Sequence, residues 1–344
     1  MRKLASIQQI MSIEPIDGAD RIELARVLGW QCVVNKGQFK SGDFAVYFET
    51  GSLLPVIPQF EFLRKTCLVS TPKGEGFRLK TQKFKGVISQ GLLLPVKEFP
   101  KIPAVQEGED LTQVLNIGKY EIEERDTNAG RIIGPRPCCI PLTEEIRIQA
   151  MPELLKEFAG LGYYITTKLD GSSHSIGIDE GTDSYYVSGR NYEYNSGPFY
   201  DFVAQREYGT KARAFAESEN LKSLVIQGEF CGPSIQGNKL KLDAPEWYVF
   251  TVIENGKRAG QQRMIKVCRA LGAEHVPIEE VGVNLPSFYP NVDALLERAE
   301  GEYPKGGRKE GIVIRPCKPV YSEIIRDYLS IKVVNNRFLL KNGE

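Results

Sequence analysis

A polar stretch punctuated by glycine and proline, from Gly118 to Pro141, divides this chain of 344 residues. Acidic residues dominate its first half, and glycine and proline recur through the second. This composition is typical of a linker or an extended crossing rather than of a helix. A chain of this length can also build two hydrophobic cores. We therefore expect one domain over residues 1–120, a linker over 121–140 and a second domain over 141–344.

Short apolar segments separated by glycine turns fill the first hundred residues, which is the rhythm of a small β-barrel. A possible helix around Pro58 to Lys65 interrupts them, as in five-stranded OB-type barrels. We expect a small OB-type β-barrel with strands at Arg21 to Val27, Trp30 to Val34, Asp43 to Glu49, Phe77 to Thr81 and Gly91 to Val96.

After the polar stretch, strand-like and helix-like segments alternate, which predicts an α+β domain of antiparallel sheets with packed helices. A helix is expected from Pro198 to about Ser218, with others near 151–158, 260–271 and 292–300. Strands are expected at Tyr163 to Leu169, Ser173 to Asp179, Ser184 to Ser188, Leu224 to Cys231, Trp247 to Ile253, Gly311 to Arg315 and Leu329 to Val334.

Charge and cysteine usage narrow the class of protein. Basic and acidic residues number 44 each, but residues 1 to 120 carry 16 basic and 12 acidic groups, which favours an anionic partner for that part. The seven cysteines include no C-x-x-C pair and are accompanied by only two histidines, so neither a zinc site nor a disulfide framework is expected. No apolar run approaches the ~20 residues that span a bilayer. We expect a cytoplasmic monomer with no membrane partner.

The run from Thr166 to Gly171 places an amine, Lys168, two residues before a carboxylate, Asp170. The glycine that follows permits a tight turn, and this combination suits covalent chemistry at a phosphate. On its own the run is also typical of a solvated lysine at a hairpin. Its meaning depends on the elements that follow it along the chain.

Further short elements follow that run in a fixed order. The whole series is Lys168-Leu169-Asp170-Gly171, Ser188-Gly189-Arg190, Gly228-Glu229-Phe230, Tyr248-Val249-Phe250, Glu310-Gly311-Ile312-Val313-Ile314 and Ser330-Ile331-Lys332. Taken together, these elements resemble the covalent nucleotidyltransferase superfamily of ATP-dependent DNA ligases, RNA ligases and mRNA capping enzymes, over roughly residues 145 to 335. The resemblance implies a nucleotidyltransferase (ATP-grasp-like ligase) domain.

The resemblance implies a role for each charged position. Lys168 is the expected nucleophile that takes AMP from ATP, and Lys332 is expected at the α-phosphate, so that Lys168, Lys332 and Glu310 are the expected catalytic residues. The expected metal ligands, for Mg²⁺ or Mn²⁺, are Asp170, Glu229 and Glu310. The expected ATP-binding residues are Thr167, Lys168, Arg147 at the pyrophosphate, Arg190 at the ribose, Glu229, Phe250 at the adenine, and Lys332.

A lysine nucleophile raises a protonation problem. Because its ordinary pKa is about 10.4, only about one molecule in a thousand carries the neutral amine near pH 7. We therefore expect the site to lower the pKa of Lys168, with a nearby Mg²⁺ and Lys332 disfavouring the ammonium form.

The position of the extra domain points to one branch of the superfamily. Only twelve residues follow Lys332, which leaves no room for the C-terminal OB domain of DNA ligases and capping enzymes. The chain instead resembles the ATP-dependent RNA ligases with an N-terminal OB-like domain followed by the nucleotidyltransferase domain. Ser330 stands where some relatives have a second lysine, and Arg337 is a candidate for that lysine's phosphate contact.

The N-terminal part contains a stretch, Phe77 to Lys85, in which four cations alternate with two aromatic residues. Such a stretch can contact phosphates and offer a stacking surface, but it also fits an amphipathic strand with a basic polar face. The candidate nucleic-acid-binding residues are Arg78, Lys80, Lys83 and Lys85.

These observations predict an ATP- and Mg²⁺-dependent RNA ligase that joins a 3′-OH to a 5′-phosphate through a lysyl-AMP intermediate. Its expected partner is RNA or an RNA-containing duplex, with nicks favoured over free ends. A DNA ligase and an RNA 5′-end adenylase are enzymatic alternatives. An RNA-binding protein that has lost catalysis is the alternative from another class, and the complete set of charged residues argues against it.

Overall fold

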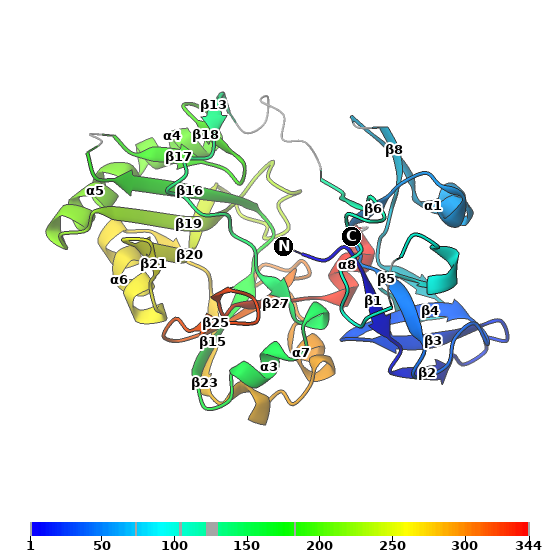
Figure 1. Ribbon diagram of the computed structural model, residues 1–344. Coiled ribbons are helices and arrows are strands. Elements are labelled where there is room, and N and C mark those ends of the chain that lie inside the picture. The colour runs from blue at the N-terminus through cyan, green and yellow to red at the C-terminus, as the bar shows by residue number, and fades with distance from the viewer. Residues whose placement is uncertain (1, 73, 103–104, 122–129, 182–183, 343–344) are drawn as a thin grey trace. The chain divides into compact units, whose positions relative to one another are not determined.

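A computed structural model describes residues 2–72, 74–102, 105–121, 130–181 and 184–342 (Figure 1). The chain forms two compact units. One comprises the described residues of 1–122, 149–152 and 339–344, and the other those of 123–148 and 153–338. Each unit contains its own clusters of buried apolar side chains.

Short antiparallel strands make up most of the first unit. Buried Trp30 and Tyr47 belong to one of its apolar clusters, and Phe48, Phe60 and Phe77 to the other. The helical segment expected at 58–65 is present. The elements are β1 (Ala5–Gln9), β2 (Ser12–Pro15), β3 (Ile22–Val27), β4 (Trp30–Asn35), β5 (Phe44–Phe48), β6 (Ser52–Leu54), η1 (Pro58–Leu63), α1 (Arg64–Cys67), β7 (Leu68–Thr71), β8 (Gly74–Arg78), β9 (Gln82–Phe84), β10 (Val87–Ser89), β11 (Leu92–Pro95), η2 (Val96–Glu98) and β12 (Gly118–Lys119).

The remaining elements alternate strands with short helices. In chain order they are β13 (Ile132–Pro135), β14 (Ile146–Arg147), η3 (Ile148–Ala150), α3 (Leu154–Glu157), β15 (Gly162–Lys168), β16 (Ser172–Asp179), β17 (Tyr186–Ser188), β18 (Tyr192–Tyr194), α4 (Pro198–Gln205), α5 (Tyr208–Ser218), β19 (Ser223–Cys231), β20 (Glu246–Glu254), β21 (Lys257–Arg258), α6 (Gln261–Leu271), β22 (Glu274–His275), β23 (Ile278–Val283), η4 (Leu285–Ser287), α7 (Val292–Arg298), β24 (Gly311–Pro316), β25 (Tyr321–Ser322), β26 (Asp327–Tyr328), β27 (Ile331–Val334) and α8 (Asn336–Asn342).

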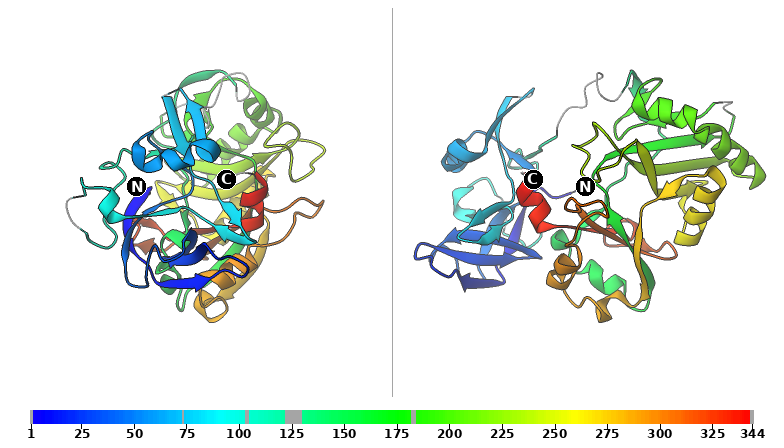
Figure 2. Two further views of the ribbon diagram at one scale, coloured as in Figure 1. Left: turned by 90° about the vertical axis from the view of Figure 1, so that its right-hand side faces the viewer. Right: turned by 180° about the vertical axis from the view of Figure 1, so that it is seen from behind.

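Two sheets organise the second unit. The β15 sheet has the strand order β14-β27-β24-β15-β23, and the β19 sheet has the order β13-β18-β17-β16-β19-β20-β21, with β22 also paired to β20. Most neighbouring strands are antiparallel, although β14 with β27 and β20 with β22 are parallel. Helices α5 and α6 pack on the β19 sheet (Figures 1 and 2). The expected antiparallel α+β organisation is therefore present.

Aromatic side chains fill the space between the β19 sheet and its helices. The ring of Phe199 lies 5.4 Å from that of Trp247 and 5.2 Å from that of Phe230. His174 of β16 joins this group, with its ring 4.5 Å from Phe199. Burial lowers the pKa of His174 to about 4, so it packs here as a neutral ring.

Several local features differ from the sequence expectation. The helix expected over 198–218 is divided into α4 and α5, because Glu207 adopts a left-handed conformation with a φ of 58°. Strands β1 and β23 and helix α8 were not anticipated. The range 121–140, expected as a linker, contains β13, which pairs with β18; residues 122–129 of that range lie outside the described residues.

No helix within the described ranges is both long and apolar enough to cross a membrane.

Close backbone packing at Gly311 predicts a strong effect of substitution. A Cβ atom at this position would lie 2.1 Å from the carbonyl oxygen of Val333 on the neighbouring strand. We expect Gly311→Ala to lower the free energy of unfolding by about 1–3 kcal/mol, as overpacking does in other cores. Urea denaturation followed by circular dichroism measures this change.

Gly134 of β13 is the matched control, because a Cβ atom there meets nothing within 4 Å. Gly134→Ala should lose no stability, since alanine also restricts the unfolded chain. Equal effects of the two substitutions would contradict the packing argument.

Candidate active site

The β15 sheet brings three cations from distant parts of the sequence to one face. Lys168 at the end of β15 lies opposite Gly311 of β24, while Lys332 of β27 is flanked by Val313 on one side and Arg147 of β14 on the other. Paired residues share a face of a sheet, as do residues two apart along a strand. Lys168, Lys332 and Arg147 therefore project from the same face, as the expected ATP site requires.

Carboxylates surround the Lys168 amine. Its Nζ lies 2.7 Å from Oε2 of Glu310, and the two side chains are 24% and 13% exposed. Glu229 also acts on Lys168 electrostatically, and its Oε1 accepts a hydrogen bond of 3.1 Å from the backbone N–H of Gly171. Asp170 lies within electrostatic range of both Lys168 and Glu310. The structure thus brings Lys168, Asp170, Glu229 and Glu310 together.

The protonation state of Lys168 differs from the expectation. Burial disfavours the ammonium, but the negative charges of Glu310 and Glu229 outweigh burial and raise its pKa above the ordinary lysine value. The chain's own side chains therefore favour the ammonium form. The lowering expected from a nearby Mg²⁺ and Lys332 stays a prediction.

The carboxylates of the group are held in different ways. Burial raises the pKa of Glu229 to about 8, although the Lys168 ammonium acts in the opposite direction. Burial also raises the pKa of Asp170, against the influence of Lys239, whose Nζ forms an ion pair with Oδ2 of Asp170. Glu310 carries the direct ion pair with Lys168.

These carboxylates form an all-oxygen donor set, which suits a hard divalent cation such as Mg²⁺ or Mn²⁺. Within the described ranges, no three His, Cys, Asp or Glu side chains are close enough to hold a metal ion by themselves. That arrangement fits a cation that keeps several of its waters and takes other oxygens from a substrate.

One phenol hydroxyl ties together the backbone of three motif residues. Tyr303 donates to the carbonyl oxygen of Lys168 at 3.1 Å and accepts from the N–H groups of Asp170, at 3.1 Å, and Glu310, at 3.0 Å. The side chain is buried against Leu169. Tyr303 lies in a loop without periodic pattern, so no spacing in the sequence could have indicated it.

A partly buried acid lies on the opposite face of the β15 sheet from Lys168. Glu279 of β23 accepts hydrogen bonds from Thr167 Oγ1 at 2.8 Å, from Lys309 Nζ at 3.0 Å and from Arg298 Nη1 at 2.6 Å. Because Thr167 alternates with Lys168, its hydroxyl faces away from the amine. The Thr167 side chain, expected at ATP, is thus not among the groups gathered around Lys168.

Ser330, which stands where some relatives have a lysine, accepts a hydrogen bond from a buried arginine. The guanidinium of buried Arg315 donates from Nε to Ser330 Oγ at 3.0 Å and from Nη2 to Glu145 Oε1 at 2.5 Å. Although burial opposes it, the charges of Arg315 and Lys332 lower the pKa of Glu145 to about 2. Arg337, the candidate for a second phosphate contact, instead forms an ion pair with Glu300 at 3.3 Å.

The two remaining candidates for nucleotide contact occupy the β19 sheet and the loop after β17. Phe250 of β20 is partly buried and packs against the apolar cluster that contains Tyr303 and Leu169, the residue after Lys168. Arg190 donates from Nη1 to the carbonyl oxygen of Thr143 at 3.1 Å. Its side chain remains 33% exposed.

The basic stretch of the first unit is divided between strands β8 and β9, so the single strand expected at Phe77 to Thr81 is not formed. The Arg78 guanidinium lies 4.2 Å from the centre of the Tyr120 ring. Lys83 and Lys85 are exposed, and Lys80 is partly exposed. None of these three lysines forms an ion pair with a described residue.

Known proteins match both parts of the chain. Residues 4–96 match the family model of an OB-fold domain, and residues 162–334 match that of RNA ligase. No curated protein matches the chain. These matches confirm the predicted fold class.

Solved structures of an RNA ligase from Naegleria gruberi resemble the whole chain. The enzyme with PPi is 29% identical, with a TM-score of 0.85, and the match covers 98% of each chain. A mutant without ligand is 30% identical at a TM-score of 0.85, covering 98% of this chain and 97% of that one. Another mutant, with ATP and Mn, is 29% identical at a TM-score of 0.85, covering 98% of each chain.

Tyr303→Phe tests the role of the shared hydroxyl. The substitution leaves two buried N–H groups and one carbonyl without this partner, so we expect a loss of about 1–3 kcal/mol in the free energy of unfolding. Tyr289→Phe is the control for chain stability, because its hydroxyl donates at 2.8 Å to Glu280 and touches none of the motif backbones.

Amide hydrogen exchange separates the two variants. Tyr303→Phe should speed exchange at the Asp170 and Glu310 N–H groups, and Tyr289→Phe should not. Unchanged protection of both groups in Tyr303→Phe would contradict the bridging role.

Proposed function

Because the chain belongs to the RNA ligase family, we propose that it joins RNA 3′-OH and 5′-phosphate ends, at nicks in duplexes, through a lysyl-AMP intermediate on Lys168. The observation that carries this proposal is the partly buried Lys168 amine, 2.7 Å from Glu310 and on the same sheet face as Lys332 and Arg147. A single amine surrounded by acids and flanked by cations suits attack on a phosphate.

ATP is the proposed source of AMP, and a divalent cation the proposed cofactor. The similar ligase from Naegleria gruberi has been solved with ATP and Mn. In this chain the oxygens of Asp170, Glu229 and Glu310 would hold the cation partly through its waters, and the cation would supply positive charge against the triphosphate and the carboxylates. The adenine would stack on Phe250, and Arg190 would contact the ribose.

The first step uses the chain's own groups as follows. Lys168 Nζ loses a proton, for which Glu310 at 2.7 Å is the nearest acceptor, and its electron pair attacks the α-phosphorus of ATP. A P–N bond forms, the bond from the α-phosphorus to the bridging oxygen breaks, and pyrophosphate leaves. Lys332 stabilises the charge that develops on the α-phosphate, and Arg147 would contact the leaving pyrophosphate.

Two further displacements complete the cycle. An oxygen of the RNA 5′-phosphate attacks the phosphorus of lysyl-AMP, which frees the Lys168 amine and leaves a 5′-to-5′ pyrophosphate link to AMP. The 3′-hydroxyl then attacks the RNA phosphate, loses its proton, and expels AMP. Both steps depend on in-line placement of the reacting oxygens more than on new functional groups.

Adduct formation tests the proposed nucleophile. The chain incubated with α-labelled ATP and Mg²⁺ should retain label and gain the mass of one adenylyl group, which is AMP less water, and Lys168→Ala should abolish both. Lys222→Ala is the matched control, because Lys222 is 77% exposed in its ion pair with Glu180. Absence of a Lys168-dependent adduct would contradict the ligase mechanism and leave an RNA-binding protein as the alternative.

Nicks of defined strand chemistry test the substrate. We expect the all-RNA nick to be sealed faster than the matched all-DNA nick, with mixed nicks ranking the contribution of each strand in a gel assay. Faster sealing of all-DNA nicks would support a DNA ligase instead. Accumulation of adenylylated 5′ ends without joining would support an RNA 5′-end adenylase.

A further inference from the structure

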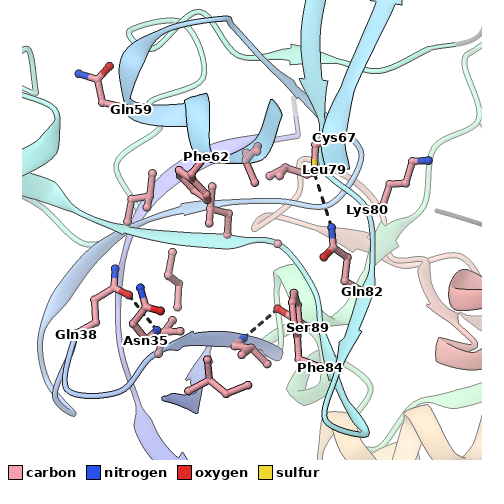
Figure 3. A pocket seen from close by; sticks show the side chains of 18 of the residues that line it. Asn35, Gln38, Gln59, Phe62, Cys67, Leu79, Lys80, Gln82, Phe84 and Ser89 are labelled. Atoms are coloured by element: carbon pink, nitrogen blue, oxygen red, sulfur yellow. Dashed lines mark hydrogen bonds between the residues drawn. The ribbon is translucent and has the colours of Figure 1, made fainter. Parts of the chain in front are cut away.

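A pocket of about 440 Å³ lies in the first unit, and none of the residues gathered around Lys168 lines it (Figure 3). Its walls come from β4, the helical segment η1 and the β9–β10 hairpin, and strand β11 contributes Leu92, Leu93 and Leu94. The volume lies within the range of about 300–1,000 Å³ that is typical of small-ligand sites. The pocket can therefore enclose a group the size of one nucleotide.

Two exposed aromatic rings border this pocket. Phe62 of η1 is 61% exposed and Phe84 of β9 is 40% exposed, although both line a concave surface. Figure 3 shows Phe62 beside the helical segment and Phe84 beside Ser89, on different sides of the pocket. Flat, exposed rings of this kind stack readily on the π face of a nucleobase.

Amide side chains add hydrogen-bonding capacity to an otherwise apolar lining. Asn35, Gln38, Gln59 and Gln82 all line the pocket. Gln38 uses its oxygen to accept from the Asn35 N–H at 3.1 Å, which leaves its NH₂ group as a donor toward a ligand. Glu98, the acid among the lining residues, can accept from an exocyclic amino group.

Positive charge adjoins the pocket on the side of Phe84. Lys80 is one of the lining residues, and Lys83 and Lys85 lie on the same segment as Phe84. Since none of the three has an acidic partner among the described residues, they can contact the phosphates on either side of a bound base.

We propose that this pocket binds one unpaired nucleobase of RNA, stacked on Phe62 and Phe84, with the adjoining phosphates held by Lys80, Lys83 and Lys85. The identification of the nucleic acid as RNA rests on the proposed function. A base within a duplex has both faces covered by its neighbours, so the pocket selects a nucleotide outside the paired region. It gives the chain a contact with RNA that is separate from the reacting ends.

Fluorescence anisotropy with two probes of equal charge tests the base directly. One probe is a labelled hexaadenylate RNA, and the other carries abasic sites in place of the adenines. The full chain should bind hexaadenylate about 5- to 150-fold more tightly than the abasic probe, which is the range of stacking on one base. Phe62→Ala with Phe84→Ala should remove most of that preference.

Matched variants separate stacking from charge. Phe44→Ala is the control, because Phe44 of β5 is 39% exposed and does not line the pocket, and it should keep the preference. Phe84→Trp should keep it as well, since indole also stacks. Alanine at Lys80, Lys83 and Lys85 should weaken binding of both probes equally and flatten the salt dependence.

Equal binding of the two probes by the unaltered chain would overturn the inference. An unchanged preference in the Phe62 and Phe84 double variant would also overturn it, provided that this variant unfolds at the same temperature as the unaltered chain. These results are independent of the adduct assay. If the chain forms lysyl-AMP but shows no base preference, the result supports the proposed function and contradicts base binding in the pocket. If the chain forms no adduct but shows the preference, the result supports base binding in the pocket and contradicts the ligase mechanism.

Discussion

The ion pair between Lys168 and Glu310 is the interaction on which the site depends. Taking both charges out of water is costly, and their attraction offsets that cost only when further groups satisfy and orient them. The negative charges of Glu310 and Glu229 raise the pKa of the amine against the opposing effect of burial. The chain's own side chains therefore favour the protonated amine, and the attack proposed for Lys168 requires a change in the surrounding charge.

Backbone geometry keeps this pair in place. The register of β15 against β24 sets Lys168 opposite Gly311, next to Glu310. The absence of a side chain at Gly311 permits the close approach of Val333 on β27, the strand on the other side of β24. The Tyr303 hydroxyl then holds the backbone at Lys168 and Glu310 from one side. Because both strands are fixed by shared partners, the reacting groups are positioned before any substrate arrives.

Sequence reasoning found the groups that carry charge but not those that hold them. Motif order brought Lys168, Glu229 and Glu310 together correctly as neighbours, since strand ends can be recognised from short apolar runs. Tyr303 could not be found because it lies in an irregular loop. Glu279 could not be found because polar and apolar residues alternate only weakly along its strand. The direction in which the chain's own side chains shift the Lys168 pKa could not be predicted either, since it depends on the distances from the amine to Glu310 and Glu229. Similarly, the local sequence did not indicate the left-handed Glu207 that divides α4 from α5.

The most direct test of this account is the pKa of Lys168 in the chain without nucleotide, measured by NMR on protein with labelled lysine side chains. Loss of one signal in Lys168→Ala assigns the resonance. The account predicts that Lys168 remains an ammonium at the pH where the exposed lysines are half deprotonated, and that Glu310→Gln moves its titration to lower pH. Titration of Lys168 below the exposed lysines in the unaltered chain would contradict it.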